Sequence, residues 1–164
     1  MENKKIHGFI YENRKINAFD IIGFTKIVKS GGELHDEIRS DGRWDILKNM
    51  NSKNKEIYGI ASQDKECPIK CKENCKSCYR YTMGIADDEN FIANLEYDDL
   101  FKFYVKESDW IVFKLDAENG YGELWGKDPY KMITELGYNY NWDLAIHIDV
   151  FYENNKIEFW MPVK

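Results

Sequence analysis

The chain has 164 residues, of which 43% are hydrophobic and 15% aromatic, and its formal net charge is −6. This length and composition favour one folded domain and argue against intrinsic disorder. The negative charge argues against direct nucleic-acid binding, which needs a basic face, and favours a cationic ligand.

The first residues contain no apolar stretch of the kind found in a secretory signal, and no run approaches the ~18 apolar residues of a membrane span. The sequence therefore predicts a cytoplasmic protein without contact to a membrane. The high aromatic content is consistent with an aromatic core or with an aromatic pocket for a small molecule.

The first half of the chain has the pattern of a strand, a helical region and two more strands. Runs rich in Ile, Phe and Tyr predict the strands, and acidic residues from Glu33 onward suit the start of a helix. Ser30-Gly31-Gly32 ends the first strand, and Asp41-Gly42 is a candidate break in the helix. The predicted bounds are 15–29, 57–62 and 79–86 for the strands and 33–50 for the helical region.

The second half repeats this order. Asp128-Pro129 has the pattern of an N-cap followed by a first-turn proline, and Gly137 that of a helix stop. Glu153-Asn154-Asn155 predicts a tight hairpin loop between the last two strands. The predicted bounds are 103–116, 143–152 and 156–163 for the strands and 122–136 for the helix.

Local similarity supports an internal duplication. The segment D-I-I-G-F at 20–24 is similar to D-W-I-V-F at 109–113. We therefore predict an α+β fold of duplicated β-α-β-β units, with pseudo-twofold symmetry, an antiparallel sheet, two helices on one side and a central cleft. Residues 1–13 are predicted as an N-terminal extension and 14–164 as one domain, with halves at about 14–86 and 99–164.

All four cysteines lie close together, within a predicted insertion at 64–78 that connects two strands. Only the last pair has the C-x2-C spacing that is usual in zinc sites. A structural zinc ion, free or redox-active thiols and an iron–sulfur cluster remain open alternatives, while a reducing cytosol disfavours disulfides. The candidate metal ligands are Cys67, Cys71, Cys75 and Cys78.

The last two strands carry the most informative pattern. Alternation along 143–152 places His147, Asp149 and Phe151 on one face and aliphatic residues on the other. We expect the aliphatic face to pack on helices, and Glu158 and Trp160 of the final strand to join Asp149 in lining the cleft. Aromatic walls with a carboxylate select a cation or an N–H donor, and burial should raise the pKa of Asp149.

Further pocket residues are predicted from aromatic side chains elsewhere. Trp44 and Trp125 lie in corresponding helical regions, near the expected opening of the cleft. Tyr81 and Trp110 lie on strands of the first and second half.

Taken together, the duplicated order, the L-G-Y turn at 136–138 and the ending I-E-F-W-M-P-V-K resemble the GyrI-like small-molecule-binding domain, the effector-binding domain of AraC- and MerR-type regulators with a SOUL-type fold. The resemblance covers roughly residues 14–164. It implies an aromatic pocket for amphipathic, often cationic compounds. The family's carboxylate on the penultimate strand, usually Glu, matches Asp149, and its usual Tyr two residues later matches Phe151; Glu158 is an alternative charge.

With no room for a DNA-binding module before residue 14, the chain resembles the stand-alone members. We therefore predict a cytoplasmic binder or sensor of aromatic or cationic amphipathic molecules, linked to transcription regulation or to drug or toxin resistance. One alternative is a hydrolase of small electrophiles that uses Asp149, Glu158 and Tyr81. Another is a protein inhibitor, for example of DNA gyrase.

Overall fold

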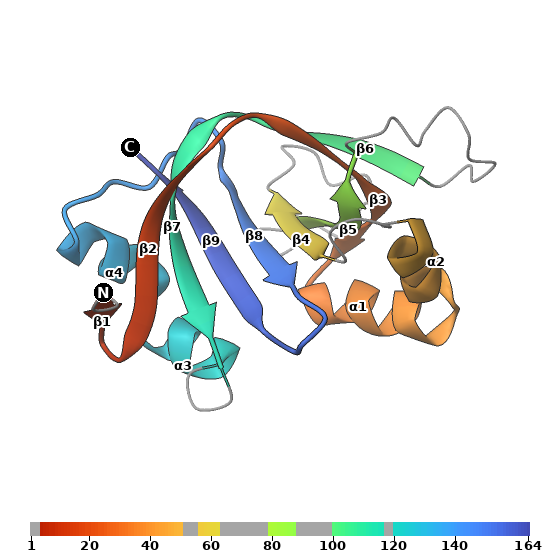
Figure 1. The fold of residues 1–164 in the computed structure, drawn as a ribbon, viewed down its shortest axis with the longest axis horizontal. Coiled ribbons are helices and arrows are strands. Elements are labelled where there is room, and N and C mark those ends of the chain that lie inside the picture. Colours follow the sequence, from red (N-terminus) through yellow and green to blue (C-terminus); the bar gives the residue numbers. More distant parts are fainter. Residues whose placement is uncertain (1–3, 51–55, 63–78, 88–99, 117–119) are drawn as a thin grey trace, which may run out of the picture.

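The computed structural model describes residues 4–50, 56–62, 79–87, 100–116 and 120–164. They form an antiparallel sheet of nine strands with two pairs of short helices, which confirms the predicted α+β class (Figure 1). The elements are β1 (Lys5–Ile6), β2 (Phe9–Ile16), β3 (Phe19–Val28), α1 (Gly31–Ser40), α2 (Arg43–Met50), β4 (Ile57–Ser62), β5 (Tyr79–Ala86), β6 (Leu100–Val105), β7 (Ser108–Leu115), α3 (Tyr121–Gly126), α4 (Pro129–Glu135), β8 (Ile146–Phe151) and β9 (Ile157–Val163). None of the helices in these ranges is long and apolar enough to cross a membrane.

Across the sheet, the strands follow the order β1-β2-β7-β9-β8-β4-β5-β3-β6. The order β3-α1-α2-β4-β5 recurs as β7-α3-α4-β8-β9, as the predicted duplication requires. A pseudo-twofold axis between the halves stays a prediction.

Both predicted helical regions are divided in two. α1 begins where the Ser30 hydroxyl accepts a hydrogen bond from the Gly32 N–H, and Gly42, with φ of +87°, separates it from α2. The Asp128 side chain accepts from the Tyr130 and Lys131 N–H groups and so caps α4, with Pro129 in the first turn.

Two predicted strands are also divided. Residues 15–29 contain the end of β2 and all of β3, and residues 103–116 contain the end of β6 and all of β7. The short links, 17–18 and 106–107, contain no Gly or Pro, so neither of these turn residues marks the boundary between the strands. β2 pairs with β7 from Ile10 to Ile16, so the predicted N-terminal extension lies partly within the sheet.

Both helix pairs cover one face of the sheet, here called the helix face. α1 and α2 bury Leu34, Ile38 and Leu47 against β3 and β5, and α3 and α4 bury apolar side chains against β7 and β9. A third cluster, with Trp110, Trp160 and Ile148, lies on the opposite face. There the β2–β3 and β6–β7 ribbons arch between opposite parts of the sheet (Figure 1).

The aliphatic side of β8 was predicted to pack on helices, and this is wrong. Ile146, Ile148 and Val150 belong to the cluster on the opposite face. The β2–β3 and β6–β7 ribbons bury the face opposite the helices. Both faces of β8 are therefore covered, and its aliphatic side does not show which face the helices cover.

β3 and β5 approach each other unusually closely where Gly23 pairs with Gly84. A Cβ atom on Gly23 would lie 2.0 Å from the Met83 carbonyl oxygen, and one on Gly84 would lie 2.1 Å from the Ile22 carbonyl oxygen. Only glycine fits at either position, because the obstructing atoms belong to the backbone.

Candidate ligand-binding site

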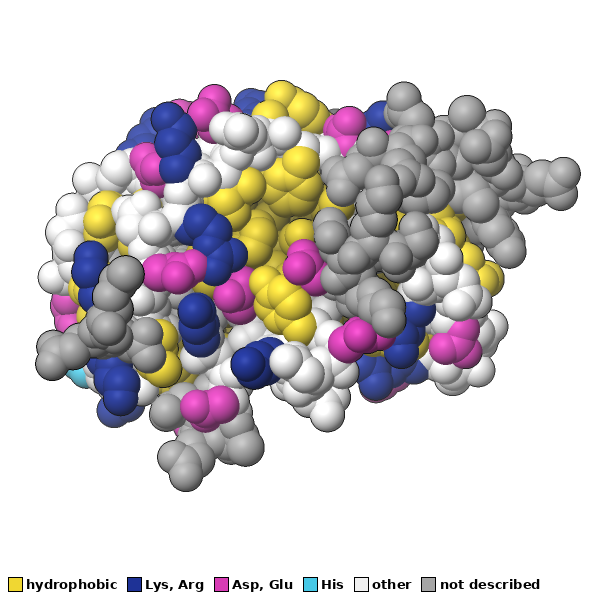
Figure 2. Space-filling view, viewed as in Figure 1, with side chains coloured by type: hydrophobic (Ala, Val, Ile, Leu, Met, Phe, Trp, Pro, Cys, Tyr) yellow, Lys and Arg dark blue, Asp and Glu magenta, His cyan; other side chains and the backbone are white. Residues whose placement is uncertain are grey.

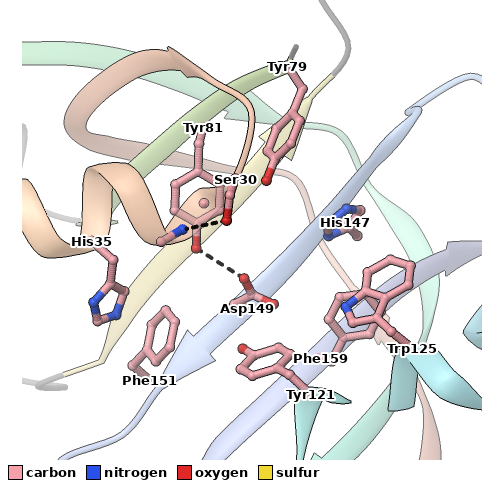
Figure 3. A pocket seen from close by; sticks show the side chains of 12 residues that line it. Ser30, His35, Tyr79, Tyr81, Tyr121, Trp125, His147, Asp149, Phe151 and Phe159 are labelled. Carbon is pink, nitrogen blue, oxygen red and sulfur yellow. Dashed lines mark hydrogen bonds between the residues drawn. The ribbon is translucent and has the colours of Figure 1, made fainter. Parts of the chain in front are cut away.

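A cavity of about 490 Å³ lies on the helix face, over β8 and between α1 and α3 (Figure 3). This volume is typical of small-molecule sites. Its walls come from both halves of the chain, and are formed by Ser30, Gly31, Gly32, His35, Tyr79, Tyr81, Tyr121, Trp125, His147, Asp149, Phe151 and Phe159.

β8 supplies the floor of this pocket. Its side chains alternate, so His147, Asp149 and Phe151 face the cavity while Ile148 and Val150 are buried on the opposite face. The carboxylate is therefore held by the rigid centre of the sheet rather than by a loop.

Asp149 carries the acidic group of the pocket. The Tyr81 hydroxyl donates a hydrogen bond to Oδ2 over 3.0 Å, whereas Oδ1 is buried and has no hydrogen-bond partner among the described residues. Burial raises the pKa of Asp149 to about 6, while the nearby Tyr121 and Tyr81 hydroxyls act in the opposite direction. Protein atoms surround the carboxyl group, although solvent reaches part of the side chain through the open cavity.

Tyr121 lies across the pocket floor and points its hydroxyl toward Asp149 (Figure 3). The hydroxyl is close enough to lower the pKa of that carboxyl, yet it completes no hydrogen bond of its own within the described residues. Burial raises the pKa values of both Tyr121 and Tyr81, so both hydroxyls stay neutral and keep their protons.

His147 lies beside Trp125 and Phe159, with ring centroids 5.7 and 5.1 Å away. Burial lowers the pKa of His147 to about 4, so the imidazole is uncharged at neutral pH. On the other side of the pocket, the rings of His35 and Phe151 are 5.1 Å apart, and burial also lowers the pKa of His35. Above pH 6, Asp149 therefore provides a negative charge within largely aromatic walls.

Five of the predicted ligand-binding residues meet in this pocket. They are Tyr81, Trp125, His147, Asp149 and Phe151. Trp44 lies outside it, where its ring contacts Phe151 and His35, and Trp110 is fully buried on the opposite face.

The predicted common face of Asp149, Glu158 and Trp160 is wrong. In the β8–β9 ladder Asp149 is opposite Phe159, so Glu158 and Trp160 project to the other side of the sheet. There Glu158 accepts hydrogen bonds from Tyr152, Trp160 and Arg14. Burial alone would raise the pKa of Glu158, but these donors hold it below its usual value.

Several pocket residues were missed in the sequence. Phe159 could have been found from the hairpin, since the register that pairs Phe151 with Ile157 also places Phe159 beside Asp149. Tyr121 and His35 had no such signal, because helix packing brings them to β8 from distant parts of the chain. The four cysteines of the predicted metal site lie outside the described residues.

The pH dependence of stability tests the burial of Asp149. Its pKa is raised in the folded protein, so folding loses stability as pH rises from about 4 to about 6. Asp149→Asn should therefore be more stable than the wild type by about 2 kcal/mol at pH 8, and equally stable near pH 3. Urea unfolding at both pH values measures this difference.

Glu158→Gln is a control for which the expected change in stability at pH 8 has the opposite sign. Since the pKa of Glu158 is lowered on folding, its charge stabilises the protein at neutral pH and this contribution is lost in acid. Glu158→Gln should therefore be less stable than the wild type at pH 8. If Asp149→Asn changed the stability by the same amount at pH 3 and pH 8, the raised pKa of Asp149 would be contradicted.

Comparison with known proteins identifies the fold. No protein-family model matches the sequence. No curated protein matches it either. Among solved structures, SAV2435 bound to tetraphenylphosphonium aligns over 94% of this chain and 93% of its own, with a TM-score of 0.67 and 13% identity. The EcmrR C-terminal domain aligns over 95% and 98%, with a TM-score of 0.60 and 12% identity.

The chain has the GyrI-like fold. This confirms the resemblance predicted from the sequence at the level of the fold. A hydrolase from Listeria innocua also shares it, with a TM-score of 0.56 and 7% identity over 94% of this chain and 91% of that one. At such identities the GyrI-like fold alone is common to these proteins, so function depends on the pocket.

Proposed function

We propose that this chain is a binder or sensor of aromatic, cationic amphipathic small molecules, which it holds in the pocket around Asp149. The observation that carries the proposal is a buried carboxylate on the floor of an aromatic cavity, with one oxygen that has no hydrogen-bond partner among the described residues. Such a group attracts a cation strongly, because little solvent screens it there.

Three further observations support this function. The Trp125, Phe151 and Phe159 rings provide apolar area and faces for cation–π contacts. SAV2435, which has the same fold, was solved with tetraphenylphosphonium, a lipophilic aromatic cation. The pocket also takes its walls from both halves of the chain, in agreement with the predicted central cleft and pseudo-twofold arrangement.

The biological role we propose is a response to such compounds, through transcription regulation or through resistance to drugs or toxins. EcmrR, whose C-terminal domain shares this fold, was solved in a complex with DNA, which supports this role. A titration with tetraphenylphosphonium tests the binding itself. Trp125 lines the pocket and is 44% exposed, so a bound aromatic cation should quench its fluorescence. Absence of both quenching and binding heat up to millimolar ligand would reject the proposal.

A hydrolase acting on small electrophiles is the second candidate. It is favoured by the pKa of Asp149, about 6, next to the hydroxyls of Tyr81 and Tyr121. A carboxylate of this pKa can act as a general base near neutral pH. Turnover of small electrophiles that is lost in both Asp149→Ala and Tyr81→Phe would favour this candidate over simple binding.

For the cysteine cluster we propose a structural zinc ion, held by the thiolates of Cys67, Cys71, Cys75 and Cys78. Four sulfur ligands form the tetrahedral set that zinc prefers. Protein purified without chelator should contain about one zinc ion per chain by elemental analysis. Protein without metal that shows four titratable thiols would exclude this site.

A further inference from the structure

Three buried polar atoms of the pocket lack hydrogen-bond partners within the described part of the chain: Asp149 Oδ1, Tyr121 Oη and His147 Nδ1. Buried polar atoms in folded proteins are nearly always paired. When unpaired ones lie together in a pocket, they indicate which groups a ligand must supply.

The carboxylate needs a hydrogen-bond donor. Its Oδ2 already accepts the only proton of the Tyr81 hydroxyl, so Tyr81 cannot also serve Oδ1. An ionised carboxylate only accepts hydrogen bonds. A ligand that covers the floor of the pocket without a donor would therefore exclude water from Oδ1 without replacing the hydrogen bond that the water provides.

The neighbouring atoms can accept as well. The Tyr121 hydroxyl faces the carboxylate, and His147 lies two residues along the same face of β8 (Figure 3). The imidazole is neutral, so with its proton on Nε2 it accepts at Nδ1. Hydrogen-bond acceptors thus lie on two sides of the space next to Oδ1.

We propose that this pocket selects aromatic compounds carrying a protonated amine with free N–H groups over quaternary ammonium or phosphonium cations. The inference rests on the proposed function and specifies its ligand class. Both kinds of cation gain from the charge of Asp149, but only the amine donates hydrogen bonds to Oδ1 and to Tyr121. Methyl groups on a quaternary nitrogen keep it beyond hydrogen-bond distance from the carboxylate.

Hydration opposes this selectivity. A primary ammonium binds water more strongly than a quaternary ion does, so removing it from water into the pocket costs more free energy. The unpaired acceptors replace the hydrogen bonds to water that the ammonium loses, whereas they would remain unpaired against a quaternary ion. Sites that hydrogen-bond an N–H group discriminate strongly against analogues that lack it. We therefore expect at least a tenfold preference for the amine.

A matched pair of ligands tests this preference. 4-Biphenylmethylammonium and its N,N,N-trimethyl analogue have the same rings and the same charge, and titration calorimetry at pH 7.5 gives both dissociation constants. The primary amine should bind the wild-type protein at least tenfold more tightly. Tyr121→Phe should reduce the preference, whereas Tyr152→Phe, which removes a hydroxyl on the opposite face, should leave it unchanged.

The outcomes distinguish the two proposals. If the trimethyl analogue binds as tightly as the amine or more tightly, the preference for N–H donors is wrong while cation binding stands. If neither compound binds and tetraphenylphosphonium does not bind either, the proposed function fails and this inference fails with it.

Discussion

Replacing Asp149 by asparagine should weaken tetraphenylphosphonium binding about 10- to 100-fold at pH 7.5. The wild-type carboxyl is ionised at this pH, since its pKa is about 6. Asparagine has nearly the same shape and can still accept the hydrogen bond from Tyr81, so the variant removes the charge and little else. At an effective dielectric constant of about 20, a cation about 6–8 Å from the carboxylate gains about 2–3 kcal/mol from its charge, which is the order of this change in affinity.

Glu158→Gln is the matched control for this experiment. It removes the same formal charge from the neighbouring strand, but its side chain lies on the opposite face beside Arg14 and Tyr152. Titration calorimetry should show nearly unchanged affinity for Glu158→Gln. Equal losses in both variants would mean that the overall charge of the protein, rather than the pocket carboxylate, attracts the cation.

Gly84→Ala should destabilise the fold by at least about 3 kcal/mol, or prevent folding. The new Cβ atom would lie 2.1 Å from the Ile22 carbonyl oxygen and 2.8 Å from the Cα atom of Gly23. These obstructing atoms belong to the backbone of β3, which pairs with β5 on one side and with β6 on the other. The strand cannot shift to make room without breaking one of these ladders.

Gly122→Ala provides the comparison. This glycine lies in α3, and beyond its chain neighbours and its own helix backbone no atom of the described residues lies within 4 Å of an added Cβ. Alanine should stabilise the helix by about 0.5–1 kcal/mol relative to glycine. Urea unfolding measures both variants, and a loss below about 1 kcal/mol for Gly84→Ala would contradict the close approach of the two strands.

Much of the pocket floor could be predicted from the sequence. Alternation within one strand depends only on that strand's own residues, so it placed His147, Asp149 and Phe151 on a common face. Which residues of β9 join them depends on the register of the hairpin. That register pairs Asp149 with Phe159, and so the alternating pattern of β9 was assigned to the wrong side.

Long-range packing limited the rest of the prediction. Tyr121 is the first residue of α3, and only the docking of that helix on the sheet brings its hydroxyl to Asp149. Glu158 looked like a second pocket carboxylate because nothing in the local sequence reveals Arg14, its partner 144 residues away. The helix break at Gly42 and the helix start at Asp128-Pro129, by contrast, were visible in the sequence, because they are local features.

The surface on the side of the β2–β3 ribbon has an apolar centre with a charged border. Apolar side chains fill its centre, and basic and acidic side chains border them (Figure 2). The cluster around Trp110 and Trp160 is buried beneath this region, with Glu158 and Arg14 at its edge. Trp110, Trp160, Glu158 and Arg14 therefore lie on the face of the sheet opposite the pocket.

The two arching ribbons also affect how the protein folds. β2, from the beginning of the chain, pairs with β7, while β6 pairs with β3, so each half contributes a strand to the other. Neither half can complete its sheet alone, and contacts far apart in the sequence must form before the structure becomes stable. Such a topology predicts slow folding, and stopped-flow refolding would measure its rate. The binding pocket, built from both halves, would then exist only in the fully folded chain.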